Sequence, residues 1–307
     1  MDKVNEFIKN RLSRRSFMAG AGTAAAGALL VGCNDATAPT TPTSPVTPPP
    51  LDVPDNDILN FALNLEYLEA EFYLRAATGS GLSSADALSG AGTVTGGTAV
   101  PGLSGAMQQY ANEIAQDELN HVRAIQKTIS GNSGTPVARP NINFTDAFNA
   151  LASAAGIAST FNPFSSPSAF LVGAFVFEDV GVTAYTGAAP MITSTAILSA
   201  AAGIQAVEAY HAAEIRTLIA GMAATSGDTT YLDYANKVSA LRATLGGGNE
   251  TTLSISSIVA ADTTNAIAFA RTTSQVLHIV YGTGGGAGVK SGAFFPNGLN
   301  GMISATS

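Results

Sequence analysis

The sequence has one cysteine, three histidines and no long uninterrupted hydrophobic segment. A single cysteine, Cys33, excludes an intramolecular disulfide and therefore a disulfide-stapled scaffold. The apolar run over residues 17–32 is shorter than the about 20 residues that a membrane-spanning helix requires. A second apolar run, Ala169–Phe177, leads directly into Glu178 and Asp179, and charges in mid-bilayer are costly. The sequence therefore predicts no disulfide and no membrane-spanning helix.

Basic residues are scarce outside the N-terminus. The first fifteen residues hold five of the 14 basic residues and two of the 22 acidic ones, which leaves 9 basic against 20 acidic residues in the rest of the chain. Nucleic-acid binding depends on neutralising phosphates with Lys and Arg, so this acidic remainder argues against a nucleic-acid partner. With 46% hydrophobic residues, the chain can bury a large core.

The N-terminus predicts export. Residues 13–19, Ser-Arg-Arg-Ser-Phe-Met-Ala, resemble a twin-arginine signal, and Leu-Val-Gly-Cys at 30–33 resembles a bacterial lipobox. We therefore predict a signal peptide over 1–33, lipidation of Cys33, and a lipoprotein held on the membrane of the periplasm or cell envelope. The alternative is that Cys33 is a small buried thiol in an ordinary signal peptide that is cleaved elsewhere.

A change in composition follows the signal. Residues 34–54 contain seven prolines and five threonines, a composition that favours an extended linker and cannot pack a core. From there we expect a helical domain over 55–282 and a Gly-rich tail over 283–307. An aperiodic stretch over 78–102 interrupts the domain, and the sequence leaves open whether it is a lid, an interface or an insertion.

Apolar periodicity predicts four long helices and a shorter fifth. The segments are Asp55–Ala77, Ser104–Ile129, Pro167 to just before Pro190, Thr193–Ala224 and Asp262–Tyr281, with a further short helix near Thr145–Gly156. Asp55 to Asp57 and Ser166 are candidate N-caps, the serine being followed by proline at the first helical position. The segment between the second and third helices is long enough for a crossover connection, so we predict an all-α four-helix bundle.

Two matched pairs of motifs place metal-ligand side chains on these helices. Residues three or seven apart lie on the same face of an α-helix. Four such faces would gather four carboxylates and two imidazoles, the ligand set of a two-metal site in a helical bundle. The motif residues are Glu66 with Tyr73, Glu118 with His121, Glu178 with Tyr185, and Glu208 with His211.

Other polar residues near the motifs are less decisive. Glu69 continues the polar stripe of Glu66 and Tyr73, but its role is open, whereas Glu71 and Glu214 are expected to be solvated. Asp117 is either a partner of an imidazole or, as we favour, a surface carboxylate. His278 has no carboxylate at ligand spacing, so it is expected in packing or at the surface.

The motifs together resemble the ferritin-like superfamily, and within it the group of desiccation-related proteins and their exported bacterial counterparts. The resemblance rests on Leu63–Tyr73, Asp117–His121, Phe177–Tyr185, Glu208–His211 and Phe294–Gly301. It implies two Fe or Mn ions, with Glu66 and Glu178 as terminal ligands, Glu118 and Glu208 as bridging ligands, and His121 and His211 as one imidazole per metal. Tyr73 and Tyr185 would be phenols that hydrogen-bond ligand carboxylates.

The function expected from this resemblance is a two-metal site at the cell envelope that acts on dioxygen or peroxide in stress defence. Bacterioferritins are shorter and form closed cages, so mineral storage is not expected. The Cys-rich electron-transfer module of rubrerythrin is absent, so a redox cycle would need an outside electron donor or a disproportionation. The alternative is a stress-protective or structural bundle in which any metal only stabilises the fold. The sequence does not decide whether the protein forms a homodimer.

Overall fold

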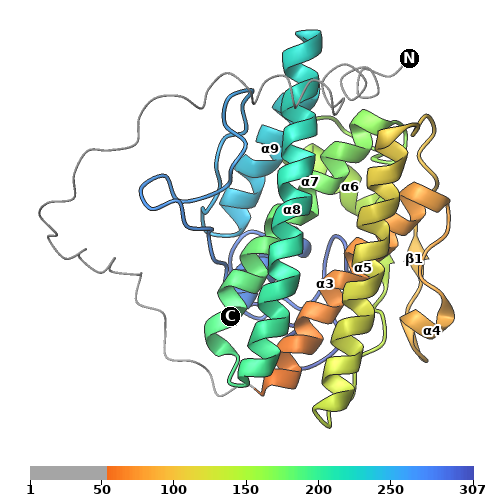
Figure 1. The fold of residues 1–307 in the computed structure, drawn as a ribbon, viewed down its shortest axis with the longest axis vertical. Coiled ribbons are helices and arrows are strands. Elements are labelled where there is room, and N and C mark those ends of the chain that lie inside the picture. Colours follow the sequence, from red (N-terminus) through yellow and green to blue (C-terminus); the bar gives the residue numbers. More distant parts are fainter. Residues whose placement is uncertain (1–53) are drawn as a thin grey trace, which may run out of the picture.

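The computed structural model describes residues 54–307; the predicted signal peptide with Cys33, and all but the end of the predicted linker, lie outside the described residues. Four long helices run side by side along the longest axis of the molecule (Figure 1). Helix α3 packs mainly on α5, and α7 packs mainly on α8. The predicted all-α four-helix bundle is thus confirmed. Its helices are α3 (Asp55–Thr78), α5 (Ala106–Gly131), α7 (Pro167–Ala188) and α8 (Thr195–Ser226).

Several helix ends follow local sequence signals. Ser166 caps α7 by accepting a hydrogen bond from Ala169 N at 3.2 Å, as predicted. Gly79 ends α3 with φ at 84°, a left-handed conformation that glycine adopts without strain. At the start of α3, by contrast, Pro54 stands at the N-cap and Asp55 does not cap its own helix. Asp55 instead accepts from the backbone N–H of Thr193, which ties the start of α3 to the α7–α8 connection.

The segment after α3 is folded against the bundle. It contains α4 (Ser84–Ala87) and β1 (Val94–Thr95), which pairs in parallel with β2 (Ile142–Asn143) beyond α5. Asp86 forms an ion pair with Arg123 of α5 at 2.7 Å. Figure 1 accordingly shows α4 and β1 alongside α5.

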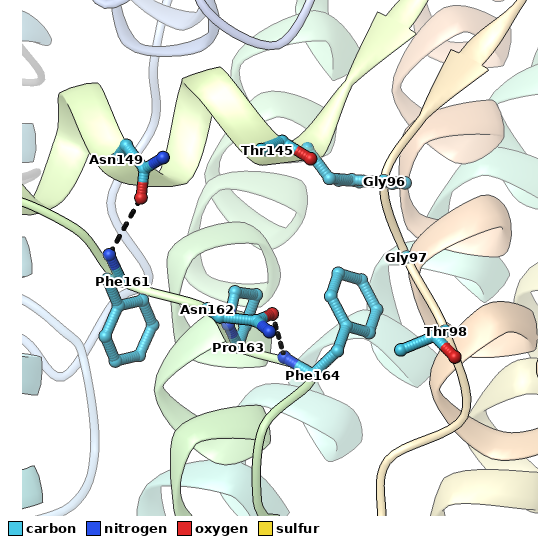
Figure 2. A pocket seen from close by; sticks show the side chains of 10 residues that line it. Gly96, Gly97, Thr98, Thr145, Asn149, Phe161, Asn162, Pro163 and Phe164 are labelled. Carbon is cyan, nitrogen blue, oxygen red and sulfur yellow. Dashed lines mark hydrogen bonds between the residues drawn. The ribbon is translucent and has the colours of Figure 1, made fainter.

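The long crossover from α5 to α7 carries α6 (Phe144–Ala154). A cavity of about 400 Å³ opens where this crossover meets the Gly96–Thr98 segment (Figure 2). Asn149 and Asn162 shape its wall, because each side-chain oxygen accepts a hydrogen bond from a nearby backbone N–H. Among residues 54–307, no acidic side chain and no histidine lines this cavity.

The C-terminal part differs from the sequence prediction in two ways. A helix that the sequence did not predict, α9 (Thr230–Leu245), packs on α7 and α8. The predicted helix Asp262–Tyr281 is wrong in its first half, since α10 covers only Thr273–Val280. Thr272 and Gln275 form a reciprocal capping box, which starts the helix at that point.

The tail after α10 completes the core. Phe294 and Phe295 are buried, and Asn300 exchanges hydrogen bonds with Asn64 of α3 at 2.9 and 3.0 Å. The tail therefore lies on the bundle, and its two phenylalanines help to bury the apolar faces of the helices.

Phenylalanines fill the core between the helices. Phe72 is fully buried, and its ring lies 5.2 to 5.9 Å from six other aromatic rings. Helix α7 together with the short 3-10 turn η1 (Ala189–Met191) is long and apolar enough to cross a membrane by composition. However, 83% of its most apolar window is buried within the protein, as in the core helix of a globular bundle.

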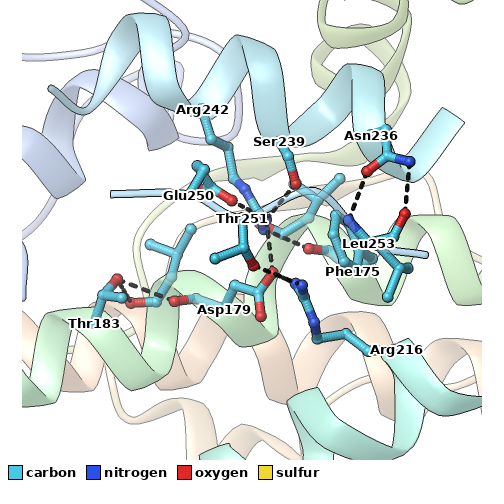
Figure 3. Close-up of polar contacts among 12 residues, drawn as sticks. Phe175, Asp179, Thr183, Arg216, Asn236, Ser239, Arg242, Glu250, Thr251 and Leu253 are labelled. Carbon is cyan, nitrogen blue, oxygen red and sulfur yellow. Dashed lines mark hydrogen bonds and ion pairs between the residues drawn. The ribbon is translucent and has the colours of Figure 1, made fainter. Parts of the chain in front are cut away.

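A buried charged network attaches α9 and the segment after it to the bundle (Figure 3). Asp179 of α7 accepts hydrogen bonds from Arg216 and Arg242, both at 2.7 Å. Glu250 pairs with Arg242 at 2.9 Å and with Arg271 at 2.7 Å. The three guanidinium groups are almost fully buried, so these carboxylates offset a desolvation cost that would otherwise be large.

Candidate metal centre

The six predicted ligand residues meet in the middle of the bundle. Helix α3 contributes one carboxylate, α7 another, and α5 and α8 each contribute a carboxylate and an imidazole. None of the six residues is more than 7% exposed. Their donor atoms form two groups, within each of which the atoms lie within 4.8 Å of one another, and Glu118 belongs to both. The groups are Glu66, Glu118, His121 and Glu208, and Glu118, Glu178 and His211.

The imidazoles sit among the carboxylates. His121 Nδ1 lies 3.2 Å from Glu66 Oε2, 3.3 Å from Glu208 Oε1 and 3.5 Å from Glu118 Oε2. His211 Nδ1 lies 3.0 Å from Glu118 Oε1. The two imidazole centres are 6.2 Å apart, so each group contains one imidazole nitrogen and Glu118 lies between them.

The donor atoms contact mainly one another. Among the described residues, the inward-facing atoms of all six make no well-formed hydrogen bond, and their nearest contacts are ion pairs within the cluster at 3.0 to 3.6 Å. Leaving one such group unsatisfied costs about 1–3 kcal/mol, and more when it is charged. Two groups of hard oxygens with one imidazole each are suited to Fe or Mn cations. The residues present therefore fit a pair of metal ions. The atoms concerned are Glu66 Oε2, both oxygens of Glu118 and of Glu208, Glu178 Oε2, and Nδ1 of His121 and His211.

The carboxylates differ in proton affinity according to what they face. Burial raises the pKa of Glu66 to about 7, although His121 opposes the shift. Burial and the charge of Glu118 raise the pKa of Glu208 well above its ordinary value. Burial also opposes ionisation of Glu118, but the close approach of both imidazoles, His121 and His211, outweighs it and lowers the Glu118 pKa to about 2. Glu118 is thus the carboxylate that is held ionised between the two groups.

Both imidazoles are held in the protonated form while only protein surrounds them. Burial lowers the pKa of His211, but the neighbouring carboxylates Glu178 and Glu118 outweigh it and raise the value to about 12. The pKa of His121 is raised further, with Glu66 as the main cause that opposes burial. Since a metal binds the neutral imidazole, loading the site must release these protons.

Two tyrosines hold the outer oxygens of the carboxylates. Tyr73 of α3 donates a hydrogen bond to Glu178 Oε1 of α7, and Tyr185 of α7 donates to Glu66 Oε1 of α3. Each phenol orients one carboxylate and leaves its second oxygen facing the cluster. This is the arrangement that the family resemblance implies for Tyr73 and Tyr185.

The neighbouring acidic residues depart from the sequence prediction. Glu71 was expected to be solvated, but it is fully buried and pairs with Arg75 at 2.8 Å and with Arg139. Glu214 was also expected in solvent, yet it is half-buried and burial raises its pKa to about 7. Asp117 combines both alternatives, since its side chain is 38% exposed and its Oδ2 lies 3.4 Å from His211 Nε2.

Two further residues lie outside the groups. His278 is buried in α10 with Nδ1 3.0 Å from the Thr283 carbonyl oxygen, so it contributes to packing, in agreement with the sequence-based expectation. Glu69 is 5% exposed and faces the cluster from α3 without joining either group. The sequence places Glu69 on the same helix face as Glu66, which indicated that it lies near the site. This spacing alone did not assign a role to Glu69.

A helical bundle that buries a cluster of four carboxylates and two imidazoles defines a class of metal-binding proteins. The chain belongs to the ferritin-like domain family, whose model matches residues 54–221, and within the ferritin-like superfamily to the desiccation-related group. It is 32% identical over 248 residues to desiccation-related protein PCC13-62 of Craterostigma plantagineum, which covers 74% of this chain and 78% of that protein. It is 28% identical over 275 residues to ferritin-like catalase Nec2 of Nesocodon mauritianus, which covers 82% and 86% of the two chains.

Proposed function

We propose that this protein holds two metal ions, Fe or Mn, and acts on hydrogen peroxide. One observation supports the proposal above all: the inward-facing donor atoms of six buried residues make no well-formed hydrogen bond with any residue that the structure describes, and they fall into two groups that share Glu118. The burial of so many unsatisfied groups is costly in any role that does not involve a cation. The metal-binding residues would be Glu66, Glu118, His121, Glu178, Glu208 and His211.

Each ion would draw its ligands from one group. Glu66, His121 and Glu208 would serve the first ion, Glu178 and His211 the second, and Glu118 would bridge the two. A pair of Fe or Mn ions supplies one-electron redox steps and Lewis acidity toward a bound oxygen species. The protein's own contribution is to orient the carboxylates through Tyr73 and Tyr185 and to exclude bulk water by burial.

Peroxide disproportionation suits this chain better than a donor-dependent reduction. In disproportionation one peroxide is oxidised to dioxygen and another is reduced to water, so no external electron donor is consumed. Cys33 is the single cysteine of the sequence and lies in the predicted signal, which leaves no cysteine-rich module to deliver electrons. The similarity to a protein named ferritin-like catalase supports the same reaction.

We further propose that the protein works at the cell envelope in defence against oxidative stress. The support is the sequence of the first 54 residues: the twin-arginine resemblance, the lipobox resemblance at Cys33 and the Pro/Thr-rich linker. A linker of this composition would hold the bundle away from the membrane surface. Labelling of the full chain with a radioactive fatty acid, compared with Cys33→Ala, tests the anchor.

Metal analysis tests the central proposal. Protein purified without chelator should contain close to two Fe or Mn per chain, and it should release dioxygen from hydrogen peroxide without an added reductant. Glu118→Gln should remove both the metal and the dioxygen release, whereas the exposed Glu113→Gln should change neither. A well-folded protein that contains no metal after growth in Fe- and Mn-supplemented medium would refute the proposal.

The second candidate is a stress-protective bundle without catalysis. The 32% identity to a desiccation-related protein favours it. The two candidates separate in one measurement, because a structural metal should raise the melting temperature but leave peroxide unconsumed.

A further inference from the structure

Glu69 is a buried carboxyl group that lacks a stabilising partner. Its side chain has no hydrogen bond or ion pair with any residue that the structure describes. Burial raises its pKa well above the ordinary value, and the charges of Glu208 and Glu118 raise it further. A buried carboxyl group among other carboxylates is expensive to keep, so a purely structural residue is expected to be apolar at this position.

Two small apolar cavities meet at Glu69. Each has a volume of about 20 Å³, and both are lined by Leu65, Glu69 and Gly181 on the seam between α3 and α7. One of them also reaches Glu66 and Tyr185, at the edge of the candidate metal centre. A cavity of this size holds roughly one water molecule. The α3–α7 seam is therefore not completely filled.

The first cavity extends from the metal centre towards the surface. Its far end is lined by Ala62, Ala188 and Ile192, which are all half-buried. At its inner end, Gly181 leaves space between two carboxylates. A Cβ at Gly181 would overlap Glu208 Oε2 and stand 3.4 Å from Glu69 Oε1. The small residues Ala62, Gly181 and Ala188 thus leave space for a small molecule along the cavity.

We propose that the α3–α7 seam is the route by which the oxidant reaches the metal centre, and that Glu69 is the polar group that binds it there. This inference rests on the proposed function. The oxidant is a neutral molecule of about two heavy atoms, such as hydrogen peroxide, because the cavities are close to the size of a water molecule. The Glu69 carboxyl group supplies the hydrogen bond that an otherwise apolar passage lacks.

The passage selects by size and by charge. Organic hydroperoxides with a branched carbon chain are too large for the cavities. Anions are disfavoured because a charge loses its hydration in a passage lined mostly by apolar side chains. Hydrogen peroxide should therefore be consumed much faster than cumene hydroperoxide, and nitric oxide should reach the metal much faster than azide.

A plug and its matched control test the route. Ala188→Phe fills the outer end of the first cavity, while Ala189→Phe adds the same ring at the next residue, which is also half-buried but does not line the cavity. Stopped-flow absorbance of the Fe(II)-loaded protein mixed with nitric oxide reports access without turnover. Ala188→Phe should slow binding at least tenfold with unchanged metal content, and Ala189→Phe should match the parent protein. Equal rates for the two variants would overturn the route.

Substitutions of Glu69 test its role. Glu69→Leu should raise the KM for hydrogen peroxide about tenfold at unchanged metal content, and Glu69→Gln, which keeps hydrogen-bonding atoms, should restore most of the loss. In the metal-free protein, Glu69→Gln should leave the melting temperature unchanged or raise it, since no partner is lost. A clear fall in that temperature would show a structural role and refute the assignment. Failure of the parent protein to bind metal would instead refute the proposed function, independently of the stability result.

Discussion

The hydroxyl group of Tyr73 on α3 donates a hydrogen bond to Glu178 on α7, across the bundle and 105 residues along the chain. Tyr185 on α7 makes the return contact with Glu66 on α3. Both phenols have a pKa raised well above the ordinary tyrosine value, mainly by burial. They therefore stay protonated and keep donating at neutral pH.

Removing either phenol should weaken metal binding without abolishing it. Residues that orient ligand carboxylates typically contribute 10- to 100-fold in metal affinity. We expect Tyr73→Phe and Tyr185→Phe each to lower the affinity of the protein for Mn by about tenfold. Competition with a chromophoric chelator measures the change. Tyr210→Phe, at a position 74% exposed, is the control, and an equal loss in that variant would contradict the role of the phenols.

The carboxylate that belongs to both donor groups should contribute more to metal binding than a carboxylate that belongs to one group. Glu118 belongs to both donor groups, whereas Glu178 belongs to one. We expect Glu118→Gln to lose both ions and Glu178→Gln to retain close to one ion per chain. Elemental analysis after gel filtration gives the stoichiometry. Retention of two ions in Glu118→Gln would show that the groups do not share this ligand.

The stability of the metal-free protein should fall as the pH rises. Glu66 has its folded pKa raised from 4.5 to about 7, so its contribution to stability is fully present below pH 4.5 and is lost as the pH rises towards 7. His211 acts in the same direction, because its pKa is raised from 6.5 to about 12. Glu118, with a pKa lowered to about 2, loses its contribution only at lower pH.

The expected difference between pH 5 and pH 7.5 is a melting temperature lower by at least about 3 °C at the higher pH. The metal-loaded protein should show the opposite trend, because metal competes with protons for the same atoms. Calorimetry of chelator-treated and metal-loaded samples at both pH values checks this. Parallel trends in the two samples would mean that the ions do not bind at these residues.

Truncation of the central aromatic ring should cost more than truncation at the edge of the cluster. Phe72 is fully buried with aromatic rings on several sides, whereas Phe161 is half-buried. We expect Phe72→Ala to lower the free energy of unfolding by about 3–5 kcal/mol. Phe161→Ala should lose less than half as much. Urea denaturation of both variants gives the comparison, and similar losses would show that Phe72 is not central to the core.

The bundle and the convergence of the motif residues were predictable because both depend on short-range patterns. Helical spacing places Glu118 and His121 on one face whatever surrounds them, and a cap such as Ser166 acts within one turn. Repetition of the pattern then identified the faces that should meet. Which residues serve as ligands, and whether Glu208 also bridges the two ions as the family resemblance implies, remains a prediction.

The sequence predictions were wrong where a contact with a distant part of the chain determines the local structure. Glu71 looked like a solvated charge on its own helix, but Arg139 reaches it from 68 residues away. Helix α9 places Arg242 in the core, where it binds Asp179 of α7 at 2.7 Å. Because this buried position is occupied by an arginine, the apolar periodicity that would predict the helix is interrupted. Asp262 binds the backbone N–H groups of Thr264 and Asn265, which favours a turn over the predicted helix.

The sharing of the donor groups among the helices has a consequence for biogenesis. The first group needs α3, α5 and α8, and the second needs α5, α7 and α8, so no single hairpin can assemble either. A nascent or truncated chain that ends before α8 cannot therefore acquire the complete ligand set. Metal that stays bound would therefore indicate that all four helices have packed together. A measurement of metal content would then distinguish fully folded molecules from partly folded ones.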